Sequence, residues 1–198
     1  WLTTYGETDA DRWVETKFKL AGFARDANRN READRLLADI LESYELMRSE
    51  LIQNGGSIGL MIVAELAFQP LVAEYEAYAS IEIPNSTDAD VLQEAVDRKI
   101  SENTRIAGLM DDFVVQYPDF EWQTAALYYK ALSFRDHGLT WLNAPNPFDG
   151  ESDDLDEVDR YFMFVDIIVA KAQPFEDTAN QLFTAVVAFA KEKKRYTE

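Results

Sequence analysis

The chain has 198 residues, of which 47% are apolar, and it carries a formal net charge of -18 at pH 7. A domain of this size buries roughly 70% of the surface that its unfolded chain exposes, so the composition is that of a folded domain and argues against intrinsic disorder. With no cysteine and the single histidine His137, the chain excludes a disulfide framework, a thiolate zinc site, a cysteine nucleophile and a paired-histidine metal site.

The charge is distributed unevenly along the chain. Residues 56–118 contain 3 basic and 11 acidic side chains, and no Lys or Arg occurs between Arg48 and Arg98. Phosphate-rich partners need clustered cations, so this pattern predicts that the chain binds neither nucleic acid nor anionic membranes. The acidity favours a basic protein partner or a saline environment, and solubility alone is the alternative explanation.

Apolar residues recur at spacings of three and four along almost the whole chain, which indicates amphipathic helices. One such stripe consists of Ala33, Leu37, Ile40, Tyr44, Met47 and Leu51. Segments rich in Gly, Pro, Asn and Asp separate the stripes and predict about seven helices. These are expected over 8–25, 30–53, 57–80, 88–116, 120–142, 154–171 and 175–195.

The turns between the predicted helices lie about 25–33 residues apart, which is typical of stacked antiparallel helices. We therefore expect an all-α fold, an antiparallel helical array in a single domain over 1–198. The first residue is Trp1 rather than Met, which predicts that the chain is a piece of a longer protein.

Several local signals refine the helix boundaries. Ser57 follows a glycine pair and is expected to cap the third helix, and Thr87 with Asp90 forms a capping pattern for the fourth. Pro70 stands inside a helical pattern, where it predicts a bend. The apolar stretch 58–73 is interrupted by polar residues and Pro70, and it is shorter than a membrane span, so no direct membrane insertion is expected.

The sequence offers few groups for chemistry. The acidic loop 149–157 does not match an EF-hand calcium loop, because aligning Gly150 with the loop glycine puts Pro145 and Pro147 at the first and third ligand positions. Its acids are expected to favour the start of the next helix. Asp111 and Asp112 point about 100° apart on a helix and do not form a catalytic pair. His137 is interpreted as a polar residue near a helix end. We therefore predict no catalytic residue, no metal site and no cofactor.

The segment from Trp122 to Tyr129 resembles the first helix of a tetratricopeptide repeat. Trp122 is followed by the small residues Ala125 and Ala126 and then by Tyr129. Small residues let a second helix approach closely, while the aromatic rings fill the space on either side. These four residues are expected to pack against a neighbouring helix.

The order of motifs after Tyr129 is similar to the C-terminal region of large envelope-associated tetratricopeptide proteins of gliding and predatory bacteria. The motifs are Asn143-Ala144-Pro145-Asn146-Pro147, Tyr161 and Ala172-Gln173-Pro174-Phe175. This resemblance implies a repeat superhelix that acts as a non-catalytic scaffold for other proteins in an envelope or gliding-motility assembly. It also implies a periplasmic or envelope location, with the cytoplasm as the alternative.

A second stripe on the same helix consists of Gln123, Leu127, Lys130 and Phe134. The corresponding stripe lines the concave groove in tetratricopeptide repeats, so the resemblance implies that these residues contact a peptide segment of a partner. The alternative is that Leu127 and Phe134 pack in the core. A self-associating helical bundle without an external ligand stays open as a second function, and an enzyme as a third.

Overall fold

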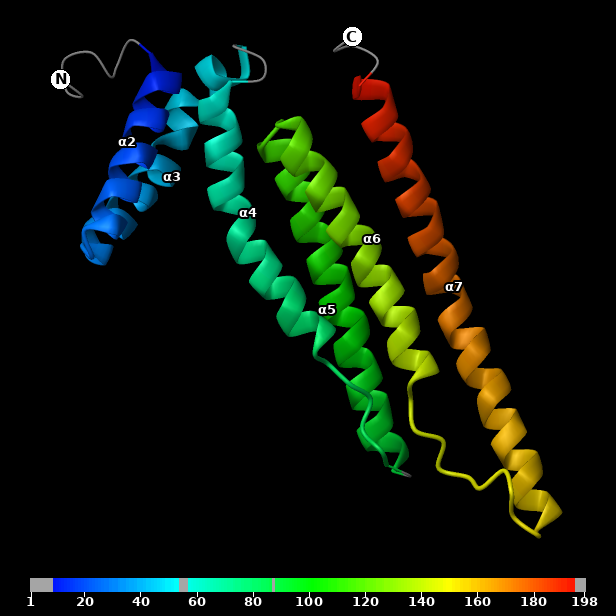
Figure 1. The fold of residues 1–198 in the computed structure, drawn as a ribbon. Helices are drawn as coiled ribbons and strands as arrows, with labels where there is room; N and C mark the ends of the chain where they lie inside the picture. Colours follow the sequence, from blue (N-terminus) through cyan, green and yellow to red (C-terminus); the bar gives the residue numbers. More distant parts are fainter. Residues whose placement is uncertain (1–8, 54–56, 87, 195–198) are drawn as a thin grey trace. The chain divides into compact units, whose positions relative to one another are not determined.

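The computed structural model describes residues 9–53, 57–86 and 88–194. Within these ranges the chain forms six α-helices and no strand, which confirms the all-α fold class (Figure 1). The helices are α2 (Ala10–Asp26), α3 (Asn30–Gln53), α4 (Ile58–Ala79), α5 (Ala89–Gln116), α6 (Phe120–Leu142) and α7 (Leu155–Lys194). The glycine pair before Ser57, Thr87 of the expected capping pattern and residue 195 at the end of the last expected helix lie outside the described residues.

The prediction of seven helices is wrong at Pro174, because α7 continues through this residue and joins the expected helices 154–171 and 175–195. Proline removes one backbone hydrogen bond and costs about 3 kcal/mol inside a helix. The buried residues Ile168, Ala172 and Ala179 keep the same helical face on both sides of Pro174, and Phe175 continues it. Packing of this continuous face offsets the free-energy cost of Pro174 inside the helix.

α4 also runs through an internal proline, Pro70, without a break in helical structure. By length and composition α4 could cross a membrane, whereas no membrane insertion was expected from the interrupted stretch 58–73. In the structure, 39% of the most apolar window of α4 is buried. Its side chains also build the apolar core described below, as a core helix does. The bend expected at Pro70 stays a prediction, because the chain passes from one compact unit to another just after it, between Leu71 and Val72.

The chain divides into two compact units. Unit 1 comprises 1–71 and 112–126, and unit 2 comprises 72–111 and 127–198. α4, α5 and α6 each contribute to both units.

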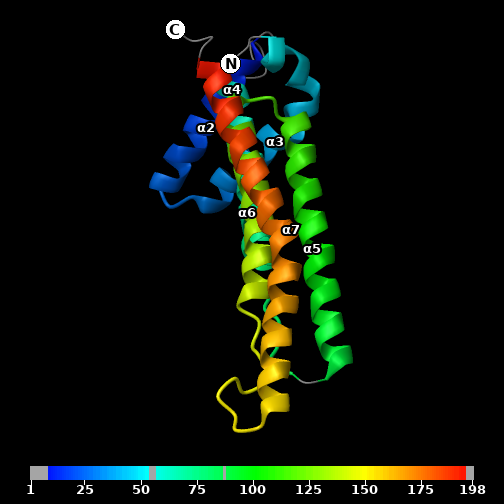
Figure 2. The same ribbon diagram turned by 90° about the vertical axis from the view of Figure 1, so that its right-hand side faces the viewer.

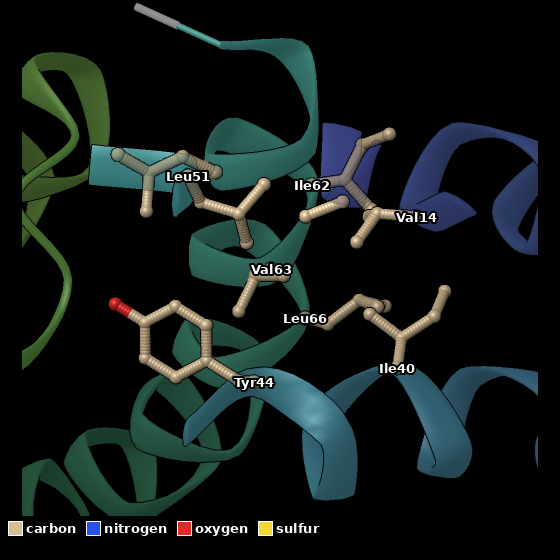
Figure 3. Packing of buried hydrophobic residues seen from close by; sticks show 9 residues of the cluster. Val14, Ile40, Tyr44, Leu51, Ile62, Val63 and Leu66 are labelled. Carbon is tan, nitrogen blue, oxygen red and sulfur yellow. The ribbon is translucent and has the colours of Figure 1, made fainter. Parts of the chain in front are cut away.

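The core of unit 1 lies between α2, α3 and the first half of α4. Figure 3 shows the buried side chains converging from these helices. Its labelled members are Val14, Ile40, Tyr44, Leu51, Ile62, Val63 and Leu66. Burial of each large apolar side chain contributes about 1.5–3 kcal/mol, so this cluster dominates the stability of unit 1.

Helix ends in unit 1 are satisfied by side chains. Ser57 caps α4 as expected, since its Oγ accepts a hydrogen bond from the Leu60 amide at 3.0 Å. At the C-terminal end of α5, the Tyr44 hydroxyl donates to the Gln116 carbonyl at 2.7 Å, and Arg48 donates to the Val115 carbonyl. These bonds fix the end of α5 against α3.

In unit 2, α7 runs antiparallel to α6 (Figure 2). The rings of Tyr128 and Phe183 lie 5.6 Å apart near one end of the pair, and those of His137 and Phe175 lie 3.8 Å apart further along α6. The acidic loop before α7 behaves as expected at the helix start, where Asp154 Oδ1 accepts a hydrogen bond from the Asp156 amide.

A glycine marks a close approach of α4 to α2 in unit 1. A Cβ added at Gly59 would lie 2.7 Å from Asp11 Oδ1 and 3.1 Å from Asp11 Cα, whereas one added at Gly22 meets nothing within 4 Å. We expect Gly59→Ala to destabilise the protein by about 1–3 kcal/mol through overpacking. Gly22→Ala should stabilise it by up to about 1 kcal/mol through helix propensity. Urea unfolding of both variants checks the pair, and equal midpoints would contradict this packing.

Candidate functional site

Two of the four predicted packing residues of α6, Trp122 and Tyr129, lie beside aromatic side chains of α4. In unit 1, the Trp122 ring lies 5.4 Å from that of Phe68, and Ala126 is fully buried. In unit 2, the Tyr129 ring meets the Tyr75 ring edge-on at 5.1 Å. Ala125 is partly buried. The small and aromatic residues of this segment are therefore placed at a helix contact within each unit.

The predicted partner-binding stripe is used partly within the chain. Gln123 Nε2 donates to the Val114 carbonyl at 2.8 Å, and Lys130 Nζ contacts both carboxylate oxygens of Asp111 at 2.7 Å. Leu127 and Phe134 are partly buried. Both polar members thus hold α6 to α5, and none of the four lines the groove described below. Partner binding by this stripe stays a prediction.

A buried polar cluster joins α4, α5 and α6 in unit 2. Lys99 is 2% exposed, and its Nζ donates to the Tyr78 and Ile81 carbonyls at 3.0 and 2.9 Å. The Tyr78 hydroxyl donates to the Ser133 carbonyl at 2.7 Å and accepts from Asn103 Nδ2 at 3.1 Å. Burial lowers the pKa of Lys99 to about 8, with Asp136 opposing that shift, and burial raises the pKa of Tyr78.

The interpretation of His137 as a polar residue near a helix end is wrong. His137 is 1% exposed, stacks on Phe175, and lies within α6 rather than at its end. Its Nδ1 has no hydrogen-bond partner among the described residues. Burial, and then the nearby Lys99 cation, lower the pKa of His137 to about 4, so the imidazole is neutral at pH 7.

A cavity of about 370 Å³ lies between the α4–α5 connection and the end of α6. Asp136 and Glu82 bring two carboxylates to its lining. Asp136 Oδ2 accepts a short hydrogen bond from the Tyr75 hydroxyl and so supports the internal contacts between α4 and α6. Burial and this carboxylate raise the pKa of Tyr75.

A larger and more apolar groove lies between α5 and α7, also in unit 2. Its volume is about 600 Å³, and Trp141 of α6 contributes to its lining. The α5 wall consists of Leu92, Gln93, Val96 and Ile100, and the α7 wall consists of Ile167, Ala170, Lys171, Pro174 and Phe175. A second apolar cavity of about 70 Å³ shares Leu92, Val96 and Trp141 with it. The groove has the size and lining of a site for apolar side chains.

Sequence reasoning missed this groove and the cluster beneath it. The spacing of Leu92, Val96 and Ile100 by four residues marks one helical face, so this wall was readable from the sequence. The α7 wall could not be predicted from the sequence, because the expected helix end at Pro174 divides this wall between two separate helices. Nothing local marks Lys99 for burial, since its acceptors lie 18 and 21 residues away.

No protein family, no curated protein and no solved structure matches this chain. Among the described residues, no group of three or more His, Cys, Asp and Glu side chains is arranged to hold a metal ion. The function is therefore inferred from the geometry of the chain itself.

The full burial of Ala126 makes it the sharpest test of α6 packing. We expect Ala126→Leu to destabilise the protein by about 1–3 kcal/mol, because the larger side chain has no space at this contact. Ala185→Leu on the exposed surface of α7 is the matched control and should change the unfolding free energy by no more than about 0.5 kcal/mol. Thermal unfolding compares them. Unchanged stability of Ala126→Leu would remove the packing argument.

The buried His137 predicts a dependence of stability on pH. The pKa of His137 is about 4 in the folded state and about 6.5 in the unfolded chain. Between these two pH values the unfolded state binds more protons than the folded state. Lowering the pH from about 6.5 to about 4 therefore lowers the free energy of unfolding, by up to about 3 kcal/mol. In His137→Phe, which keeps a ring against Phe175, this loss should disappear. The NMR titration of this lone imidazole measures the folded pKa directly, and a value near 6.5 would contradict the burial.

Proposed function

We propose that the chain is a non-catalytic module that binds other proteins. The observation that carries the proposal is the apolar groove between α5 and α7, whose wall residues Ile100 and Ile167 are 44% and 54% exposed. Exposed apolar surface inside a groove is typical of binding surfaces, because the free energy falls when a partner covers this surface and removes it from water.

The groups with shifted pKa values support a structural role over catalysis. Lys99 and Tyr78 are engaged by backbone carbonyls, and Tyr75 donates to Asp136. A catalytic acid or base needs to reach a substrate proton, whereas these groups hold α4, α5 and α6 together.

The finer part of the proposal is a tetratricopeptide-like superhelical scaffold in a bacterial envelope or gliding-motility assembly. It rests on the resemblance of the segment from Trp122 to Tyr129 and of the motifs that follow. The burial of Ala126 beside aromatic contacts of α6 is compatible with this packing mode. A periplasmic or envelope location belongs to the same proposal, with the cytoplasm as the alternative.

Self-association is the second candidate function, and a separate surface favours it. Leu155, Phe162 and Val169 follow one another at intervals of seven on α7, and they are 78%, 58% and 48% exposed. A heptad line of this kind is the seam along which two helices pack. A second copy of α7 would cover it without occupying the groove walls.

Site-specific photo-crosslinking of the full-length protein in its native cells distinguishes these functions. A photoreactive residue at Ile167 should give a discrete adduct with another protein, whereas one at Leu46, which is 90% exposed on α3, should give none. An adduct of twice the mass of the protein, formed from Phe162, would favour self-association instead. Absence of any adduct from Ile167 would contradict the proposal.

A further inference from the structure

We propose that the groove between α5 and α7 receives a basic amphipathic helix of another protein. This inference rests on the proposed function and names the partner class of the same groove. The partner's apolar face would insert between the two walls, and its flanking Lys and Arg side chains would lie against the acidic edges of the groove.

The apolar part of the groove matches the geometry of a helix face. Leu92, Val96 and Ile100 extend over eight residues of α5, or about 12 Å at 1.5 Å per residue. A partner helix presents apolar side chains at positions i, i+3, i+4 and i+7 over about the same length. On the opposite wall Ile167, Ala170 and Pro174 are spaced by three and four, so they also share one face of α7.

Two lines of exposed carboxylates accompany the walls. On α7, Asp159, Asp166 and Asp177 are separated by seven and eleven residues, which places them on one face of the helix. On α5, Asp90 and Asp97 are separated by seven residues. Within the described part of the chain, these five carboxylates form no ion pair with Lys or Arg.

The charge beside the groove favours a basic partner. Among the described residues that line the groove, Lys171 is the one charged side chain. The five carboxylates lie outside this lining, on helix faces next to the two walls, and two of them, Asp97 and Asp177, accept hydrogen bonds from Gln93 and Gln173. The whole chain carries -18, so a basic segment is also attracted from a distance, more strongly at low salt. An acidic or neutral helix would satisfy the apolar walls and leave the carboxylates without a cationic partner.

The test uses the full chain and synthetic peptides of about 15 residues, long enough to become helical on binding. One peptide has leucines at i, i+3, i+4 and i+7 with lysines elsewhere, a second has the same composition in scrambled order, and a third replaces lysine by glutamate. We expect the first peptide to bind at least about 10-fold more tightly than the other two in fluorescence anisotropy.

Substitutions then place the peptide in the groove. Ile100→Ser and Ile167→Ser should each weaken binding of the first peptide about 10-fold, and Leu46→Ser on α3 should leave it unchanged. Asp166→Lys, next in the chain to the wall residue Ile167, should weaken binding and reduce its dependence on salt, whereas Asp112→Lys, at an exposed position of α5 well beyond the wall residue Ile100, should alter it less. Circular dichroism verifies that each variant is folded.

Several results would overturn the inference. Equal binding of the scrambled peptide would show attraction by charge alone, and tight binding of the glutamate peptide would give the partner the opposite charge. A dimer whose formation the first peptide blocks would assign the groove to a second copy of the chain. If Ile167 crosslinks to another protein while the first peptide fails to bind, the proposed function stands and the basic helix is wrong.

Discussion

The packing of α4, α5 and α6 in unit 2 depends on the burial of the ammonium group of Lys99. Burying a charge costs several kcal/mol unless polar partners replace water, and here the Tyr78 and Ile81 carbonyls at the C-terminal end of α4 do so. The Tyr78 carbonyl lies in the last turn of α4, at the negative end of the helix dipole, so the site suits a cation. Because Tyr78 also bonds to Asn103 and to the Ser133 carbonyl, one side chain fixes the register of α4, α5 and α6.

The state of His137 follows from this constraint. A neutral imidazole stacks on Phe175 at little cost, whereas an imidazolium at the same place would be desolvated beside the Lys99 cation. Neutral His137 therefore lets α7 pack on α6 through apolar contacts while the charge stays at the end of α4. The polar cluster joins α6 to α4 through the Ser133 carbonyl, and the apolar stack joins α6 to α7 through His137.

The sequence predicts the helices well and their contacts poorly. Turn residues and apolar periodicity are local signals, so the ends of α3, α5 and α6 agree with the expected 30–53, 88–116 and 120–142 to within one residue. The continuity of α7 through Pro174 depends on packing of Ile168, Ala172 and Ala179, which no local signal contains. For the same reason the burial of Lys99 and His137 could not be predicted from the sequence. Of the two groove walls, only the α5 wall could be recognised from the spacing of its residues.

The two walls of the groove are held by different kinds of contact. Lys99 and Asn103 lie on the same helical face as the wall residues Leu92 and Val96, and their directional hydrogen bonds to Tyr78 tightly specify the position of the α5 wall relative to α4. The contacts described for α7 against α6 are aromatic and apolar, and such contacts are less sensitive to small sliding or rotation. A rigid wall provides register for a partner, and an adjustable wall accommodates side chains of different size. Under the proposed function, the groove would select partners by charge and spacing more than by exact shape.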